Sequence, residues 1–198
     1  MKTGLIIAGV IVLVLIVLVS VIIGGLNTVV TLDENVTAAW AQVENQYQRR
    51  LDLIPNLVET VKGVAGFEKE TYTAVTEARA KASEIKVTPE MMTDPQAFGK
   101  FQAAQNSLGS ALSRLLVTVE NYPQLKANEN FLTLQAQLEG TENRIAVERR
   151  RYNEAAQTFN TYIRKIPGML FAALRGLTEP RLYFEAASGA EQAPEVTF

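Results

Sequence analysis

The chain opens with an apolar run that no other part of the sequence matches. Residues 5–23 read LIIAGVIVLVLIVLVSVII and carry no charge. A helix of this length spans about 28 Å, which is close to the hydrocarbon thickness of a bilayer. The run is longer than the roughly 7–15 apolar residues of a cleaved signal peptide, and residues 22–25 make a poor cleavage site. The pattern predicts a retained membrane anchor over residues 1–25.

The charges that flank the anchor predict its orientation. Lys2 precedes the apolar run, whereas the first charges after it are Asp33 and Glu34, and the next basic residue is Arg49. Positive charge favours the cytoplasmic side. We therefore expect a single-pass protein of the cell (inner) membrane, with its N-terminus in the cytoplasm and most of the chain on the extracytoplasmic or periplasmic side.

After the anchor, apolar residues recur at steps of three and four, which is the spacing of one buried helix face. Gly24 and Gly25 lower helix propensity where the anchor leaves the bilayer, and residues 31–34 have the form of a capping box. The spacing predicts a helix from there to about Ile85. Its apolar stripe comprises Val36, Trp40, Val43, Tyr47, Leu51, Ile54, Val58, Val61 and Ala65.

Pro55 interrupts this stretch and leaves two interpretations. Asp52 could cap a second helix that follows a tight reversal, or one helix could kink at the proline. The unbroken stripe favours the kink. A kink frees a main-chain carbonyl near Arg50 or Leu51, which a side chain from another helix could satisfy.

Two further long helices follow a loop over residues 86–94. Thr88 and Asp94 each precede a proline, as N-cap residues often do. The first of these helices ends at Pro123, and Asn128 can cap the second, which Pro167 and Gly168 stop. The apolar stripes comprise Phe98, Phe101, Leu108, Leu112, Leu115, Val119 and Tyr122, and then Phe131, Leu134, Leu138, Ile145, Tyr152, Phe159, Ile163 and Ile166.

The predicted fold class is all-α: an N-terminal transmembrane helix followed by an antiparallel bundle of three to four long helices. Sustained three-four spacing predicts coiled-coil-like packing. The bundle domain is expected over residues 26–184. Within it, residues 169–174 predict a short apolar helix and residues 182–184 a brief extended segment. Residues 185–198 are small and polar, and we expect a mobile tail.

Composition excludes whole classes of chemistry. The chain has no cysteine and no histidine, which removes disulfides, thiolate metal sites, cysteine nucleophiles and Ser-His-Asp triads. Di-metal carboxylate bundles need histidine as well. Net charge is −2, and no basic patch suggests nucleic acid. We expect no catalytic residue, no cofactor, no metal ion and no nucleic-acid partner.

Two charged segments lie close to the apolar stripes, at residues 49–58 and 138–153. We interpret them as one structural network between helices, in which Arg50, Asp52 and Asn56 pair with Glu142, Asn143 and Arg149. Buried charge pairs fix register more than they add stability. A solvated charged face and a ligand or ion site are the alternatives.

The same segments resemble the LemA family of single-pass bacterial membrane proteins. The resemblance rests on the anchor, RRLDLIPNLVETVKG at 49–63, LKANENFLTLQAQLEGTENRIAVERRRYN at 125–153, and the positions of Pro167 and Phe184. It implies an antiparallel helical bundle behind an N-terminal anchor. It implies no chemistry, because the family has no established catalytic activity and its members are described as membrane proteins of poorly known role.

Two functions follow from these expectations. The first is a membrane-anchored, non-enzymatic interaction or scaffold protein that acts through helical faces. The first helix is expected to be longer than the two helices that pack on it. No helix of the same chain would then cover its stripe at Val36, Trp40 and Val43, and this stripe would form a homo-oligomer interface. Alternatively, residues 169–184 fold back over that stripe, or Trp40 belongs to a four-helix core. The second function is a sensor or signal-coupling module that works through a membrane-protein partner.

Overall fold

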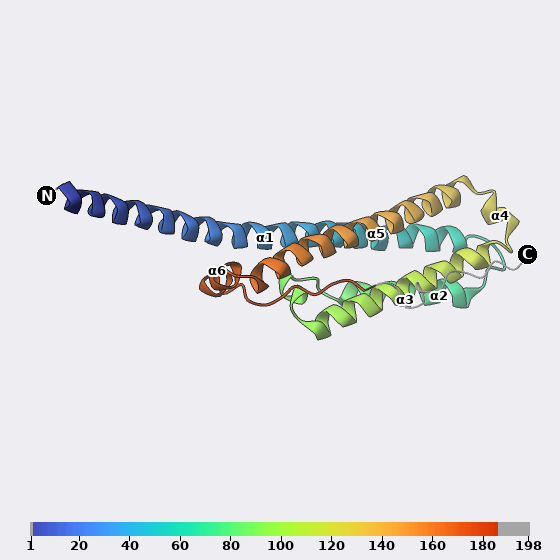
Figure 1. Ribbon diagram of the computed structural model, residues 1–198. Helices are drawn as coiled ribbons and strands as arrows, with labels where there is room; N and C mark the ends of the chain where they lie inside the picture. The colour runs from blue at the N-terminus through green and yellow to red at the C-terminus, as the bar shows by residue number, and fades with distance from the viewer. Residues whose placement is uncertain (1, 186–198) are drawn as a thin grey trace, which may run out of the picture. The chain divides into compact units, whose positions relative to one another are not determined.

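The computed structural model describes residues 2–185, and within this range it is helical without a strand (Figure 1). The predicted all-α class is confirmed. The chain divides into two compact units, Met1–Ala39 with Glu154–Arg181, and Trp40–Asn153 with the segment that begins at Leu182. The helices are α1 (Lys2–Lys62), α2 (Lys69–Glu84), the 3₁₀ turn η1 (Pro89–Met92), α3 (Pro95–Val119), α4 (Pro123–Lys126), α5 (Glu129–Arg164) and α6 (Gly168–Arg175).

Helix α1 begins earlier and ends earlier than the sequence pattern predicts. The helix continues through Gly24 and Gly25 despite their low propensity, and the Thr31 hydroxyl donates to the Asn27 carbonyl at 3.0 Å instead of capping a new helix. Helix formation is cooperative, so the long apolar run carries the helix through both glycines. The expected end at Ile85 is also wrong. The helix stops at Lys62, and Gly66, with φ of 83°, helps to form the turn into α2.

Pro55 lies inside the continuous helix α1, so the interpretation with two helices separated at Asp52 is wrong. Proline has no N–H, and the Leu51 carbonyl four residues earlier therefore loses its helical donor. The Arg79 Nε on α2 donates to that carbonyl at 2.8 Å. The predicted partner from another helix exists, and α2 supplies it.

The Trp40–Asn153 unit holds the main apolar core, in which α2 packs on α3 (Figure 1). The caps predicted at Asp94 and Asn128 form: the Asp94 carboxylate accepts from the amides of Gln96 and Ala97, and the Asn128 side chain accepts from the Phe131 amide at 3.0 Å. Thr88 precedes η1 but makes no capping bond with its side chain. The Tyr122 hydroxyl donates to the Gly66 carbonyl at 3.0 Å and fixes the turn between α1 and α2.

Aromatic rings surround Trp40 in the same unit. Its ring centroid lies 5.3–5.8 Å from those of Phe98, Phe101, Tyr152 and Phe184. Val36 and Val43 have no exposed surface, and Trp40 is 3% exposed. The premise that this stripe lacks cover within one chain is therefore wrong. Phe184 stacks on Trp40 because the segment after α6 returns, as the fold-back alternative predicted.

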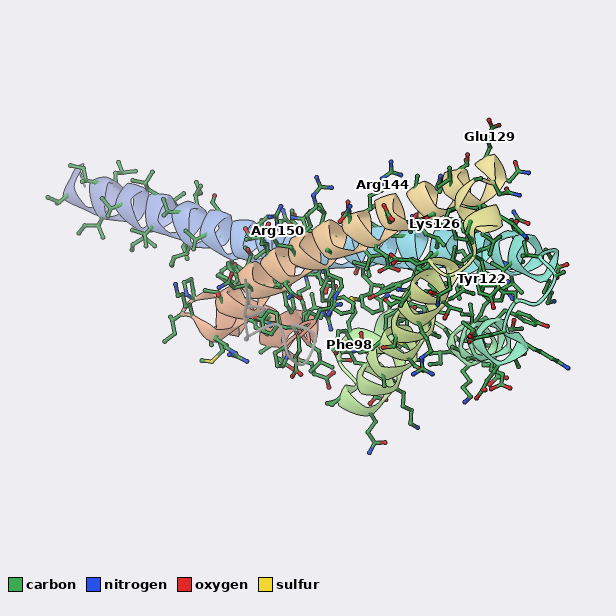
Figure 2. The ribbon with its side chains drawn as sticks, turned by 90° about the vertical axis from the view of Figure 1, so that its right-hand side faces the viewer. Phe98, Tyr122, Lys126, Glu129, Arg144 and Arg150 are labelled. Carbon is green, nitrogen blue, oxygen red and sulfur yellow. The ribbon has the colours of Figure 1, made fainter. Side chains whose placement is uncertain are left out.

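The other unit contains the anchor. Within α1, residues 5–23 expose their side chains on every side (Figure 2), and intramolecular cover begins at Gly25. The Phe171 ring of α6 contacts Gly25 so closely that a side chain there would overlap it. The Tyr162 hydroxyl donates to the Gly25 carbonyl at 2.9 Å, and Arg181 pairs with Asp33 at 2.5 Å. The short helix predicted over residues 169–174 is confirmed as α6.

The contact between Arg79 and Leu51 makes a prediction that a double-mutant cycle can test. Arg79→Met leaves a partly buried carbonyl unpaired, and we expect a loss of about 1–2 kcal/mol in unfolding free energy. Pro55→Ala restores an N–H that can donate to the same carbonyl. In the Pro55→Ala background, Arg79→Met should therefore cost clearly less. Chemical denaturation of the four variants in detergent measures this, and equal costs in both backgrounds would contradict the assignment.

Candidate functional site

A polar cleft lies between α1, α3 and α5 in the Trp40–Asn153 unit. Its volume is about 600 Å³. Each of the three helices contributes charged or hydrogen-bonding side chains. The lining residues are Tyr47, Arg50, Gln105, Asn106, Gly109, Ser110, Ser113, Glu142, Ile145 and Arg149.

Arg50 forms the floor of this cleft and is 3% exposed. Its Nη1 donates to the Glu142 carboxylate on α5 at 2.7 Å. Its Nη2 donates to the main-chain carbonyl of Gln105 on α3 at 3.2 Å, and also to the Gln105 side-chain oxygen. Its Nε has no hydrogen-bond partner among the described residues. One guanidinium therefore holds three helices in register.

Gly109 of α3 lies next to this guanidinium. A Cβ atom at Gly109 would lie 3.9 Å from the Arg50 Nη1, which is an ordinary van der Waals contact.

Arg149 connects the cleft to the end of the described chain. We call residues 182–185 the strap. The Arg149 Nη2 donates to the Glu185 main-chain carbonyl at 2.6 Å, and the guanidinium carbon lies 4.8 Å from the Phe184 ring centroid. This arginine therefore lines the cleft and holds the strap at the same time.

Several main-chain hydrogen bonds hold the strap. Asn153 makes two hydrogen bonds to Phe184, accepting from its amide at 2.9 Å and donating to its carbonyl at 2.9 Å. The Leu182 amide donates to the Met92 carbonyl at 2.9 Å, and Gln102 donates to Glu185. The Phe184 side chain fills the aromatic cluster around Trp40. Such pairs of bonds replace the partners that an extended main chain lacks outside a sheet.

Tyr47 carries the one perturbed pKa in the lining. Burial raises the pKa of its phenol above the usual value, while the charges of Arg149 and Arg50 oppose that shift. The Arg50 guanidinium carbon lies 5.1 Å from the Tyr47 ring centroid. The phenol is therefore neutral at neutral pH, and it offers the cleft a hydroxyl rather than a negative charge.

The structure brings together only part of the predicted polar network. Arg50 and Glu142 form an ion pair, and Arg149 lines the same cleft. Asp52 is exposed and accepts from Gln48 within its own helix at 2.8 Å. Asn56 and Asn143 are exposed as well, and neither joins Arg50. Arg144 lies on the exposed face of α5, and its side chain points outward from the helix (Figure 2).

Sequence reasoning assigned no contact to Gln105, Arg79 or Asn153. Gln105 stands in a core position of the α3 stripe, and a buried amide at such a position predicts a polar partner.

The cleft presents more hydrogen-bond donors than acceptors, which suits a carboxylate or phosphate oxygen as a ligand. Over residues 2–185, no group of three acidic, histidine or cysteine side chains is placed to hold a metal ion.

These features define a class: helical-bundle proteins behind one N-terminal helix long and apolar enough to cross a membrane. The sequence model of the LemA family matches residues 39–198. The chain belongs to the LemA family.

Curated relatives agree with this assignment. The chain is 28% identical over 179 residues to magnetosome protein MamQ 2 of Paramagnetospirillum magneticum, a match that covers 82% of this chain and 66% of the relative. It is 27% identical over 143 residues to protein LemA of Metamycoplasma hominis, covering 72% and 61% of the two chains. The chain thus spans slightly less than two thirds of these relatives.

The ion pair predicts coupling between Arg50 and Glu142. Glu142→Ala leaves a buried donor without its acceptor, which should lower unfolding free energy by about 1–3 kcal/mol. In a cycle with Arg50→Met we expect a coupling energy above about 0.5 kcal/mol. Glu139→Ala is the matched control, because Glu139 is exposed and bonds Gln135 on its own helix. If the losses in unfolding free energy of Glu142→Ala and Arg50→Met simply add in the double variant, the two side chains do not interact.

The raised pKa of Tyr47 predicts an alkaline loss of stability. Its folded-state pKa lies above the unfolded value of 10.0, so its contribution is fully present below that pH and is lost as pH rises through the folded pKa. Tyr47→Phe should reduce this loss. Thermal unfolding of both proteins from about pH 9 to about pH 12 measures it, because other groups cancel in the difference. Parallel pH profiles would contradict the assignment.

Proposed function

We propose that this chain is a membrane-anchored, non-enzymatic interaction protein that presents a helical bundle on the extracytoplasmic side of the cell membrane. The observation that supports this most is the polar cleft, which joins three helices and offers hydrogen-bond donors to a partner. The apolar helix supports anchoring. The proposed partners are the bilayer, further copies of this chain and a membrane protein.

The cleft and the strap form the surface that we propose for protein contact. Ser110 and Ser113 present exposed hydroxyls at the rim, and Arg149 stands between them and the strap. Because Val36, Trp40 and Val43 are buried in the single chain, self-association would use other, exposed positions.

Site-specific photo-crosslinking in cells tests this function. A photoreactive residue at Ser110 should give a discrete adduct with a second protein or a second copy. Ser107 is the matched control, since it is exposed on the same helix and lies outside the cleft lining. Absence of adducts at Ser110, or the same adducts at Ser107, would overturn the proposed contact surface. Turnover of a small molecule that Ser110→Ala and Ser113→Ala both abolish would overturn the non-enzymatic assignment.

A sensor is the second candidate, and the double role of Arg149 favours it. An oxyanion bound in the cleft would compete with Glu185 for this guanidinium and alter how the strap is held. Phosphate or a dicarboxylate should then raise the melting temperature of the full chain in detergent by several degrees at saturation. Arg149→Gln should abolish that shift. No shift with either anion would contradict the sensor.

Reporter fusion tests the proposed orientation. A reporter joined after Phe198 should be active only if it functions outside the cytoplasm, because Lys2 is the sole basic residue that precedes the apolar run. A fusion that works only in the cytoplasm would reverse the topology. A mature N-terminus near Gly25 would show cleavage instead of anchoring.

A further inference from the structure

Helix α6 carries an exposed apolar face that the bundle does not cover. Ile166 is 79% exposed, Leu174 72%, Leu170 57% and Met169 47%. On α6 itself, Leu170 and Leu174 lie four residues apart with Met169 beside them, and Ile166 lies in the turn just before the helix. The opposite side of α6, with Gly168, Phe171 and Ala172, is buried.

The position of α6 along α1 places this apolar face close to the end of the apolar run. Phe171 packs on Gly25, and Tyr162 donates to the Gly25 carbonyl. Gly25 lies two residues after Ile23, which is about 3 Å along a helix. If residues 5–23 span the hydrocarbon layer, Gly25 lies at the boundary between acyl chains and headgroups. Tyrosine is enriched at this level of membrane proteins.

Between Glu154 and Glu179 the chain carries only positive charges. These are Arg164, Lys165 and Arg175, and all three are exposed. A short apolar stripe flanked by exposed cations is typical of helices that lie in a membrane interface. Cations near such a surface are attracted to anionic lipid headgroups.

We propose that α6 is an interfacial helix that lies on the same bilayer that α1 spans. Ile166, Met169, Leu170 and Leu174 insert at the acyl-chain boundary. Arg164, Lys165 and Arg175 contact anionic lipid phosphates. The bilayer is the occupant that the contact with Gly25 favours, because the stripe continues the apolar surface of the span. This inference rests on the anchoring in the proposed function.

Single cysteine labels test the depth of α6, and the chain contains no cysteine that would need removal. Leu174→Cys and Ile166→Cys, each carrying a nitroxide, are placed in nanodiscs that hold one chain. Accessibility to oxygen and to an aqueous nickel chelate is then measured. Gln157→Cys is the water-exposed reference on α5 of the same unit. Leu15→Cys is the reference for the span.

We expect the labels at 166 and 174 to be several-fold less accessible to the chelate than the label at 157, and more accessible to oxygen. Chelate accessibility at 174 equal to that at 157 would overturn the proposal. Protection that appears only with two chains per disc would assign the stripe to a second copy and would overturn it as well. Failure of the label at 15 to enter the oxygen-rich zone would instead overturn the anchor itself.

The cations are tested by lipid composition. In discs with anionic phosphatidylglycerol, the label at 174 should lie deeper than in discs of phosphatidylcholine alone. Replacing Arg164, Lys165 and Arg175 with glutamine should remove that difference while leaving helical content unchanged. Equal depth in both lipids for the chain with its three cations would overturn their role.

Discussion

A buried guanidinium needs acceptors, and in this bundle the need of Arg50 decides how three helices pack. Its hydrogen bonds reach Gln105 on α3 and Glu142 on α5. Arg50 is 3% exposed whereas Glu142 is 45% exposed, so a slip of one residue in any of these helices would leave the buried guanidinium without an acceptor. Leaving a buried charge without its partner is costly, so these bonds penalise a wrong register. The apolar stripes alone would tolerate several registers.

The same logic recurs at two other places in the fold. Pro55 removes one helical donor, and Arg79 replaces it from α2. The strap has no sheet partner, and Asn153 supplies both of the bonds that Phe184 lacks. In each case a main-chain group that regular structure leaves unpaired is satisfied by a polar side chain from another element. These side chains determine how the elements pack on one another, which helix propensity does not determine.

Sequence predicted those parts whose signals are local. The apolar run, the cap at Asp94 and the cap at Asn128 depend on neighbouring residues, and the structure reproduces them. The sequence did not predict the turn between α1 and α2. Both helices bury an apolar stripe with the same spacing, and this spacing does not show where the chain reverses direction. The cover over Trp40 depends on a segment more than a hundred residues away. Of the predicted network, Arg50 and Glu142 meet. Arg50 lies three residues after Tyr47 and four before Ile54, which places it on the buried stripe, whereas Asp52 falls on the opposite face of the helix.

The strap also bears on how its own residues can vary. Asparagine amides recognise an N–H and a C=O, which every residue but proline provides, so the bonds at Phe184 impose an extended conformation without demanding a side chain. The ring of Phe184 is held by its contacts with the aromatic side chains around Trp40. The docked conformation therefore depends on the spacing between the hydrogen-bonded main-chain groups and this ring. An insertion or deletion of one residue there would move the ring away from the aromatic cluster while the donor and acceptor groups of Asn153 stayed in place.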